Sequence, residues 1–162
     1  MNSHLHNIVD VYIDLGGFGR EAVTRSNSPS IAGFMKNLRP FFKVEGIEVR
    51  TICTVAYSTQ TGGSGPDIIR ESLDVMFAKH RAQISWSRRP PYEVLQELIM
   101  KELDASRLAH HVMLVTSNVS FADVLEILKK QRRAVLVCGK TLDPKLRRGA
   151  DRSILVAHFV PA

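Results

Sequence analysis

The chain has 162 residues, of which 44% are hydrophobic and 23% charged, with a formal net charge of +6. This length suits one domain, and this apolar fraction excludes an intrinsically disordered chain. Two cysteines, Cys53 and Cys138, are too few for a disulfide scaffold or a cysteine-based zinc site.

The location and domain count are predicted from apolar runs and from the distribution of charge. No apolar run approaches the roughly 18–20 residues that a bilayer span needs, and the polar segment Met1 to Asn7 lacks the pattern of a secretory signal. We therefore expect an intracellular, cytoplasmic protein without a membrane partner. Residues 1–89 and residues 90–162 each hold 11 basic and 8 acidic side chains, or +3 apiece. This even spread predicts one domain over residues 1–162, with its core at about 8–158.

Short β-branched apolar runs alternate with longer segments of helical period. In chain order the pattern first predicts strand Ile8–Ile13, a helix opening at Ser28-Pro29 and running to about Phe42, strand Ile47–Ala56 and a glycine-rich loop Thr59–Gly65. It then predicts a helix from Pro66 to about Lys79, strand Ala82–Trp86, a helix from Pro90-Pro91 through Leu103 and strand Val112–Val115. The last elements are a helix capped by Asn118 or Ser120, strand Ala134–Cys138, a short helix Pro144–Arg148 and strand Ile154–Phe159.

This alternation is typical of a parallel sheet with helices on both faces. It predicts an α/β, Rossmann-like three-layer sandwich whose mainly parallel sheet has five or six strands. Pro40 is expected to kink or end the first helix, and Gly46 to mark its stop.

Ligands of an open parallel sheet bind at the carboxyl ends of its strands, and Asp14 follows the first strand directly. A carboxylate there needs a cation or hydrogen-bond donors. It is either a ligand for Mg²⁺ or Mn²⁺ or a turn residue that accepts N–H bonds from Gly16 and Gly17. Glu93, in the first turn of the third helix, faces the same edge or only stabilises the helix dipole. Asn118 is either a substrate contact or an N-cap.

Two glycine-containing segments suggest phosphate binding at first sight. The run from Gly16 to Gly19 could bring backbone amides close to a phosphate or simply form a tight turn. Gly139-Lys140-Thr141 resembles the end of a Walker A loop, but Ala134 stands where the first glycine is required. This spacing excludes a P-loop ATPase.

Hydroxyl and basic side chains near the strand ends are candidates for binding RNA phosphates: Arg88, Arg89, Ser117, Ser120, Lys140, Lys145, Arg147 and Arg148. Their alternative is a solvated basic surface. Tyr57 and Trp86 lie near predicted strand ends, where they could stack on a base or pack into the fold.

Two motifs resemble the NYN domains of the PIN-like ribonuclease superfamily. One is the opening strand with its acid, Val11-Tyr12-Ile13-Asp14-Leu15-Gly16-Gly17-Phe18. The other follows strand Val112–Val115 and reads Thr116-Ser117-Asn118-Val119-Ser120-Phe121. The nearest type is that of the meiosis-regulator and mRNA-stability factors, whose third helix opens with an acidic pair where this chain has Tyr92-Glu93. The resemblance covers roughly residues 8–158.

The resemblance implies a Rossmann-like PIN fold in which a carboxylate cluster binds Mg²⁺ or Mn²⁺ and cleaves RNA. By position, Asp14, Glu93 and Asn118 are the catalytic residues, and Asp14 and Glu93 the metal ligands. The chain departs from the pattern at three places, because Gly17 replaces the usual Asn, Asn118 the main acid after the fourth strand and Ser120 a second acid. Each missing carboxylate weakens the attraction for a hard dication.

These departures predict a catalytically weakened or inactive relative of the endoribonucleases that binds RNA, with a protein partner or a second copy of the chain as further partners. One alternative is an active Mg²⁺- or Mn²⁺-dependent endoribonuclease acting on single-stranded RNA. Another is a receiver-like or nucleotide-binding α/β module. A receiver needs an Asp at the end of the third strand to accept a phosphate, and this chain has none there.

Overall fold

A computed structural model of the chain describes residues 7–18, 29–58 and 64–160. Six parallel strands form one sheet in the order β3-β2-β1-β4-β5-β6. Their bounds are β1 Ile8–Ile13, β2 Glu48–Tyr57, β3 Gln83–Ser87, β4 His111–Val115, β5 Ala134–Gly139 and β6 Arg152–Leu155. The order makes β1 and β4 neighbours at the centre of the sheet, which is the topological switch point of a Rossmann-like fold.

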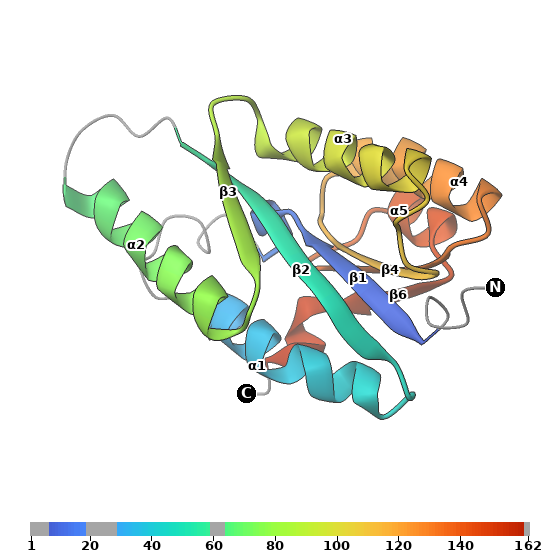
Figure 1. The fold of residues 1–162 in the computed structure, drawn as a ribbon, viewed down its shortest axis with the longest axis horizontal. Helices are drawn as coiled ribbons and strands as arrows, with labels where there is room; N and C mark the ends of the chain where they lie inside the picture. The colour runs from blue at the N-terminus through green and yellow to red at the C-terminus, as the bar shows by residue number, and fades with distance from the viewer. Residues whose placement is uncertain (1–6, 19–28, 59–63, 161–162) are drawn as a thin grey trace.

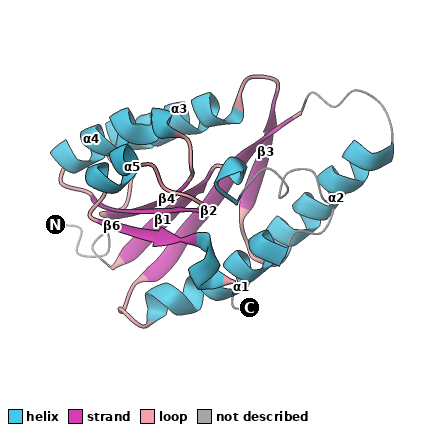
Figure 2. Cartoon of the chain, turned by 180° about the vertical axis from the view of Figure 1, so that it is seen from behind, coloured by secondary structure: helices cyan, strands magenta, loops and turns pink. Residues whose placement is uncertain are grey.

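Helices cover both faces of this sheet (Figure 1, Figure 2). One face carries α1 (Pro29–Lys43) and α2 (Ser64–Lys79), and the other carries α3 (Pro91–Asp104), α4 (Ala122–Lys130) and α5 (Pro144–Gly149). A separate apolar cluster fills each side of the sheet. The predicted α/β three-layer sandwich with a parallel sheet is therefore confirmed. None of the helices in the described part of the chain combines the length and apolar character of a bilayer span.

The first helix follows the predicted pattern but continues past its proline. Pro40 lies inside α1, which ends at Lys43. Its ring is on the exposed side of the last turn. Proline has no N–H to donate within the helix, and at this position water can bond the carbonyl oxygen that is left without a donor. Gly46 then takes a left-handed φ of 75°, as expected of a stop signal. Ser28 and the loop residues 59–63 lie outside the described residues.

The sixth strand was predicted in the wrong place. It spans Arg152–Leu155, and Val156–Phe159 forms a 3-10 turn (η5) instead of continuing it. The reason is packing, because Phe159 is buried and its ring meets that of Phe34 on α1 at 5.0 Å. The second helix begins at Ser64, two residues before the predicted start.

Candidate functional site

The carboxyl ends of the three central strands are joined by backbone hydrogen bonds just beyond the sheet. Asp14 N donates to Val115 O at 2.7 Å, which extends the β1–β4 pairing by one residue. Thr116 N donates to Cys138 O at 2.8 Å, and Lys140 N donates to Gly17 O at 2.6 Å. The segments that follow β1, β4 and β5 are thereby held against one another, and Asp14 lies among them.

The Asp14 carboxylate is half-buried and is bound by neutral donors. Its Oδ2 accepts a hydrogen bond from the Thr116 hydroxyl at 2.8 Å, and its Oδ1 accepts a longer one from Gly16 N at 3.3 Å. Burial raises the pKa of Asp14, and the bonds from Thr116 and Gly16 offset only part of that rise. The carboxyl group is thus placed where its charge is costly, and within residues 7–18, 29–58 and 64–160 no cation contributes to its stabilisation.

The glycines after β1 serve the packing of this site. Residues Leu15–Phe18 form a 3-10 turn (η2), in which Gly17 N donates to Asp14 O at 2.8 Å. A Cβ on Gly17 would lie 2.8 Å from the backbone N and Cα of Thr116. The turn itself agrees with the tight-turn interpretation of the sequence. The glycine at position 17 is explained by the close approach of two backbones, which was not predicted.

Replacing Gly17 with alanine is therefore expected to lower the free energy of unfolding by about 1–3 kcal/mol, the usual cost of forcing a methyl group against a packed backbone. Gly16→Ala is the matched control, because a Cβ there would meet its nearest atom, Asp14 Oδ1, at an ordinary 3.6 Å. Urea unfolding followed by the fluorescence of the single tryptophan, Trp86, measures both. Equal midpoints for the two variants would contradict the close packing.

The polar residues after β4 are occupied by local hydrogen bonds. Asn118 caps the 3-10 turn Val119–Phe121 (η4), its Oδ1 accepting from Ser120 N at 2.9 Å, while its own N–H donates to the Thr116 hydroxyl at 3.0 Å. Ser117 Oγ donates to Thr141 O at 2.8 Å. Ser120 Oγ accepts from Gln96 Nε2 at 2.9 Å. Asn118 therefore caps η4 and not α4, whose N-cap residue, Phe121, makes no side-chain capping bond. Ser120, the other predicted cap of the fourth helix, does not cap it either.

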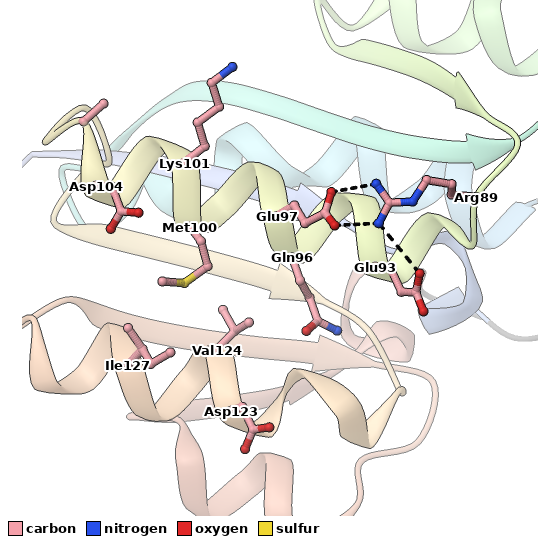
Figure 3. A pocket seen from close by; sticks show the side chains of 11 residues that line it. Arg89, Glu93, Gln96, Glu97, Met100, Lys101, Asp104, Asp123, Val124 and Ile127 are labelled. Atoms are coloured by element: carbon pink, nitrogen blue, oxygen red, sulfur yellow. Dashed lines mark hydrogen bonds and ion pairs between the residues drawn. The ribbon is translucent and has the colours of Figure 1, made fainter.

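Glu93 lies in a groove between α3 and α4 (Figure 3). Its carboxylate is 3.9 Å from Arg89 Nη2, and the same guanidinium makes two hydrogen bonds, at 2.5 and 2.9 Å, to Glu97. Arg89 is thus held by two acids of α3, which leaves it a weaker candidate for an RNA phosphate than its neighbour Arg88. No described hydrogen bond or ion pair links Glu93 to Asp14.

The predicted basic residues follow two different strands of the sheet or lie on helix α5. Arg88 follows β3, whose last residue, Ser87, accepts a hydrogen bond from Ser58 N at 2.7 Å. Lys140 follows β5 and is exposed, and Lys145 lies in the first turn of α5. Arg147 and Arg148 lie in the last turn of that helix, further from the strand ends.

Arg152, which follows the predicted basic residues in the chain, is used in contacts within the fold. It is the first residue of β6 and lies opposite Leu136, the third residue of β5. There its guanidinium pairs with Glu45 at 2.7 Å and stacks over the Phe41 ring.

The two aromatic candidates have different environments. Tyr57 ends β2 with 42% of its surface exposed. Trp86 instead packs against α2, donating from Nε1 to Asp74 at 3.1 Å while Arg70 lies 4.7 Å above its ring. Tyr57 is therefore available for stacking at the carboxyl edge, and Trp86 is used in the fold.

A metal centre built from several acids does not fit this arrangement. In the part of the chain that the structure describes, no three His, Cys, Asp or Glu side chains lie close enough to share one metal ion. Mg²⁺ and Mn²⁺ prefer oxygen ligands, usually with more than one carboxylate among them. The acid cluster that the family resemblance implies is thus not formed by the described residues.

Two further residues have contacts that the sequence did not predict. Thr116, fully buried directly after β4, belongs to the second motif, but its bond to Asp14 was not predicted. Asp10 is 1% exposed inside β1 and binds Arg50 of β2. A carboxylate within an otherwise apolar strand is itself a signal, since it must have a partner. Cys53 and Cys138 are buried free thiols, and burial raises the pKa of each to about 12.

Comparison with known proteins places the chain in a fold class. No family model and no curated protein matches the sequence. A crystal structure of a protein of unknown function from Vibrio parahaemolyticus is similar, with a TM-score of 0.69 and 16% identity over 99% of both chains. At this identity the similarity shows the fold alone. The chain is thus an α/β domain of the Rossmann-like class.

Proposed function

We propose that this chain is a PIN-like domain of the NYN type that binds single-stranded RNA along the carboxyl edge of its sheet without cleaving it efficiently. The two sequence motifs support the family, and the Rossmann-like fold is the one that the resemblance implies. The proposal depends chiefly on one observation. Asp14 is the sole acid directly following a central strand in the described residues, and its oxygens bind a hydroxyl and an amide.

This observation favours binding over cleavage. Metal-assisted hydrolysis of a phosphodiester needs a dication held firmly enough to activate water. One carboxylate with a raised pKa is a poor ligand for such an ion, and Asn118 uses its carbonyl oxygen as a helix cap. A weak Mg²⁺ or Mn²⁺ site at Asp14 remains part of the proposal.

The side chains left free at the same edge suit RNA. Tyr57 at the end of β2 offers an exposed ring for base stacking. Arg88 after β3 and Lys140 after β5 have no side-chain partner among the described residues, so their charges are available to phosphates. The strands that precede them, β3 and β5, are separated by four interstrand distances, or about 19 Å. The three groups therefore line a path that an extended strand can follow past Asp14.

Binding is tested by fluorescence anisotropy with a labelled single-stranded RNA of mixed sequence over a series of salt concentrations. The double variant R88Q/K140Q should reduce the slope of log affinity against log salt by about 1.4, since each phosphate contact to a single strand contributes about 0.7. Y57A should weaken binding about tenfold through lost stacking. K129Q/K130Q, on the last turn of α4, removes the same charge at the opposite edge and should leave the slope unchanged.

Cleavage is followed in the same samples with Mn²⁺ or Mg²⁺ added. Metal-dependent cleavage that D14N abolishes would show an active endoribonuclease and refute the non-cleaving part of the proposal. No binding by the wild-type chain, or equal salt slopes for R88Q/K140Q and K129Q/K130Q, would refute an RNA site at this edge. The receiver alternative is disfavoured by the strand order, because receivers have the order 2-1-3-4-5, and by Ser87 at the end of β3.

A further inference from the structure

A second hollow, of about 1090 Å³, opens at the amino edge of the sheet, away from Asp14. Its walls come from the starts of β1 and β2, the last turns of α1 and the turn between α2 and β3. The α1–β2 turn lies at the lower end of the sheet in Figure 1, opposite the ends of β2 and β3. This hollow belongs to neither the Asp14 site nor the α3–α4 groove.

Positive charge dominates the lining of this hollow. Arg39, Lys43 and Arg81 line it together, against one acid, Glu48. Arg50 also borders it, but its guanidinium is held by Asp10. The three other cations differ from it, because within the described residues none of them forms an ion pair with a carboxylate.

Arg81 lies close enough to Arg39 to disfavour the charge of Arg39. Arg39 Nη1 donates to His80 O at 3.0 Å, which brings the end of α1 against the turn that holds Arg81. Burial and the nearby Arg81 charge both lower the pKa of Arg39. The dipole of α1 accounts for cations at Arg39 and Lys43, which lie in its last two turns. It does not account for Arg81, which comes from another element and adds a third positive charge.

Apolar side chains complete the same walls. Pro40, Ile47 and Val49 line the hollow beside the cations. Its volume of about 1090 Å³ is slightly above the range for small-molecule sites, about 300–1,000 Å³, so a small molecule fits with room for water. Such a site suits a ligand that carries negative charge on one part and a flat or apolar body on another.

We propose that this hollow binds a small organic phosphate of about the size of a nucleotide. The guanidinium groups of Arg39 and Arg81 can each present paired N–H donors to phosphate oxygens, and Lys43 adds a third charge. The ligand's body packs against the wall formed by Pro40 and Ile47. A bound phosphate also removes the repulsion between the two arginines, so binding stabilises this edge of the fold.

Isothermal titration calorimetry at about 150 mM salt tests the site, with adenosine 5′-diphosphate, inorganic pyrophosphate and adenosine as probes. We expect the diphosphate to bind, pyrophosphate to bind more weakly, and adenosine not to bind detectably. The double variant R39Q/R81Q should reduce the affinity for the diphosphate at least tenfold. K36Q/R132Q is the matched control, since Lys36 is an exposed residue of α1 and Arg132, like Arg81, follows a helix at a left-handed φ.

No binding of the diphosphate to the wild-type chain would overturn the proposal, as would equal affinities of R39Q/R81Q and the control. Equal binding of adenosine and its diphosphate would exclude recognition of phosphate. If R39Q/R81Q instead loses affinity for RNA while the diphosphate never binds, the occupant is an RNA backbone and the small-molecule proposal is wrong. A failure of RNA binding at the Asp14 edge alone leaves the diphosphate titration unaffected, so the two proposals fail separately.

Discussion

Replacing Asp10 with alanine is expected to lower the free energy of unfolding by about 3 kcal/mol, the low end of the range for breaking a buried ion pair. Asp10 is 1% exposed within β1 and accepts hydrogen bonds from Arg50 Nε at 3.0 Å and Nη2 at 2.5 Å. It also accepts from Ala109 N at 2.9 Å. The variant therefore leaves a buried amide without an acceptor and a guanidinium without its counter-ion. Because Arg50 is 38% exposed, water can hydrate part of its charge.

Urea unfolding at neutral pH measures this loss. D10N is the informative control, because an asparagine keeps an acceptor for Ala109 N and loses only the charged pair with Arg50. It should lose about half as much stability as D10A, since an unsatisfied buried donor costs about 1–3 kcal/mol by itself. A loss for D10A of less than about 0.5 kcal/mol, the ordinary scatter of surface substitutions, would show that this pair does not hold β1 to β2 and to the segment before β4.

Asp10 also shows where prediction from the sequence stops. The apolar run from Ile8 to Ile13 predicts the strand, but the partners of Asp10 lie 40 and 99 residues away. The pairing of β1 with β2 also shifts register between Val9 and Asp10. Neither the shift nor the partners follow from local pattern, because they depend on which strands become neighbours. Alternation of strands and helices indicates a parallel sheet without fixing its order.

At the candidate site, too, the sequence predicted residues but not their long-range contacts. The rule that ligands bind at strand ends selects Asp14 from the sequence, and the rule for helix starts leaves Asn118 and Ser120 as alternative caps. The bond between Asp14 and Thr116 was not predicted, since it requires β1 and β4 to lie side by side. The partner of Arg89 was missed for another reason. Glu97, eight residues on, binds it across two turns of α3, beyond the usual helical spacings.

The pH dependence of the Asp14 site has a definite sign. Its folded pKa is raised, so the folded chain keeps this proton to higher pH than the unfolded chain does. The contribution of Asp14 to stability is therefore fully present below its ordinary pKa and is lost as pH rises through the folded value. The hydrogen bond from Thr116 limits the loss, because it favours the charged form.

T116V, which is nearly isosteric, is expected to lower the free energy of unfolding by about 3 kcal/mol at pH 8 and by about 1 kcal/mol at pH 4. Thr116 is fully buried, and its hydroxyl donates to Asp14 Oδ2 and accepts from Asn118 N. The variant loses both bonds, but a larger fraction of Asp14 is protonated at pH 4 than at pH 8, and the protonated form carries no charge that needs the missing donor. Urea unfolding of the wild type and T116V at several pH values between 4 and 8 measures the difference.

A double-mutant cycle with D14N separates the charge from the packing. The amide of D14N can accept from Gly16 N and donate to the Thr116 hydroxyl, so that variant should be at least as stable as the wild type at pH 8 and should lose the pH dependence. In its background T116V should cost the same at pH 4 and pH 8, because no carboxylate remains to be left without a donor. A cost of T116V that varies with pH even in the D14N background would show that another titrating group, and not Asp14, is coupled to Thr116.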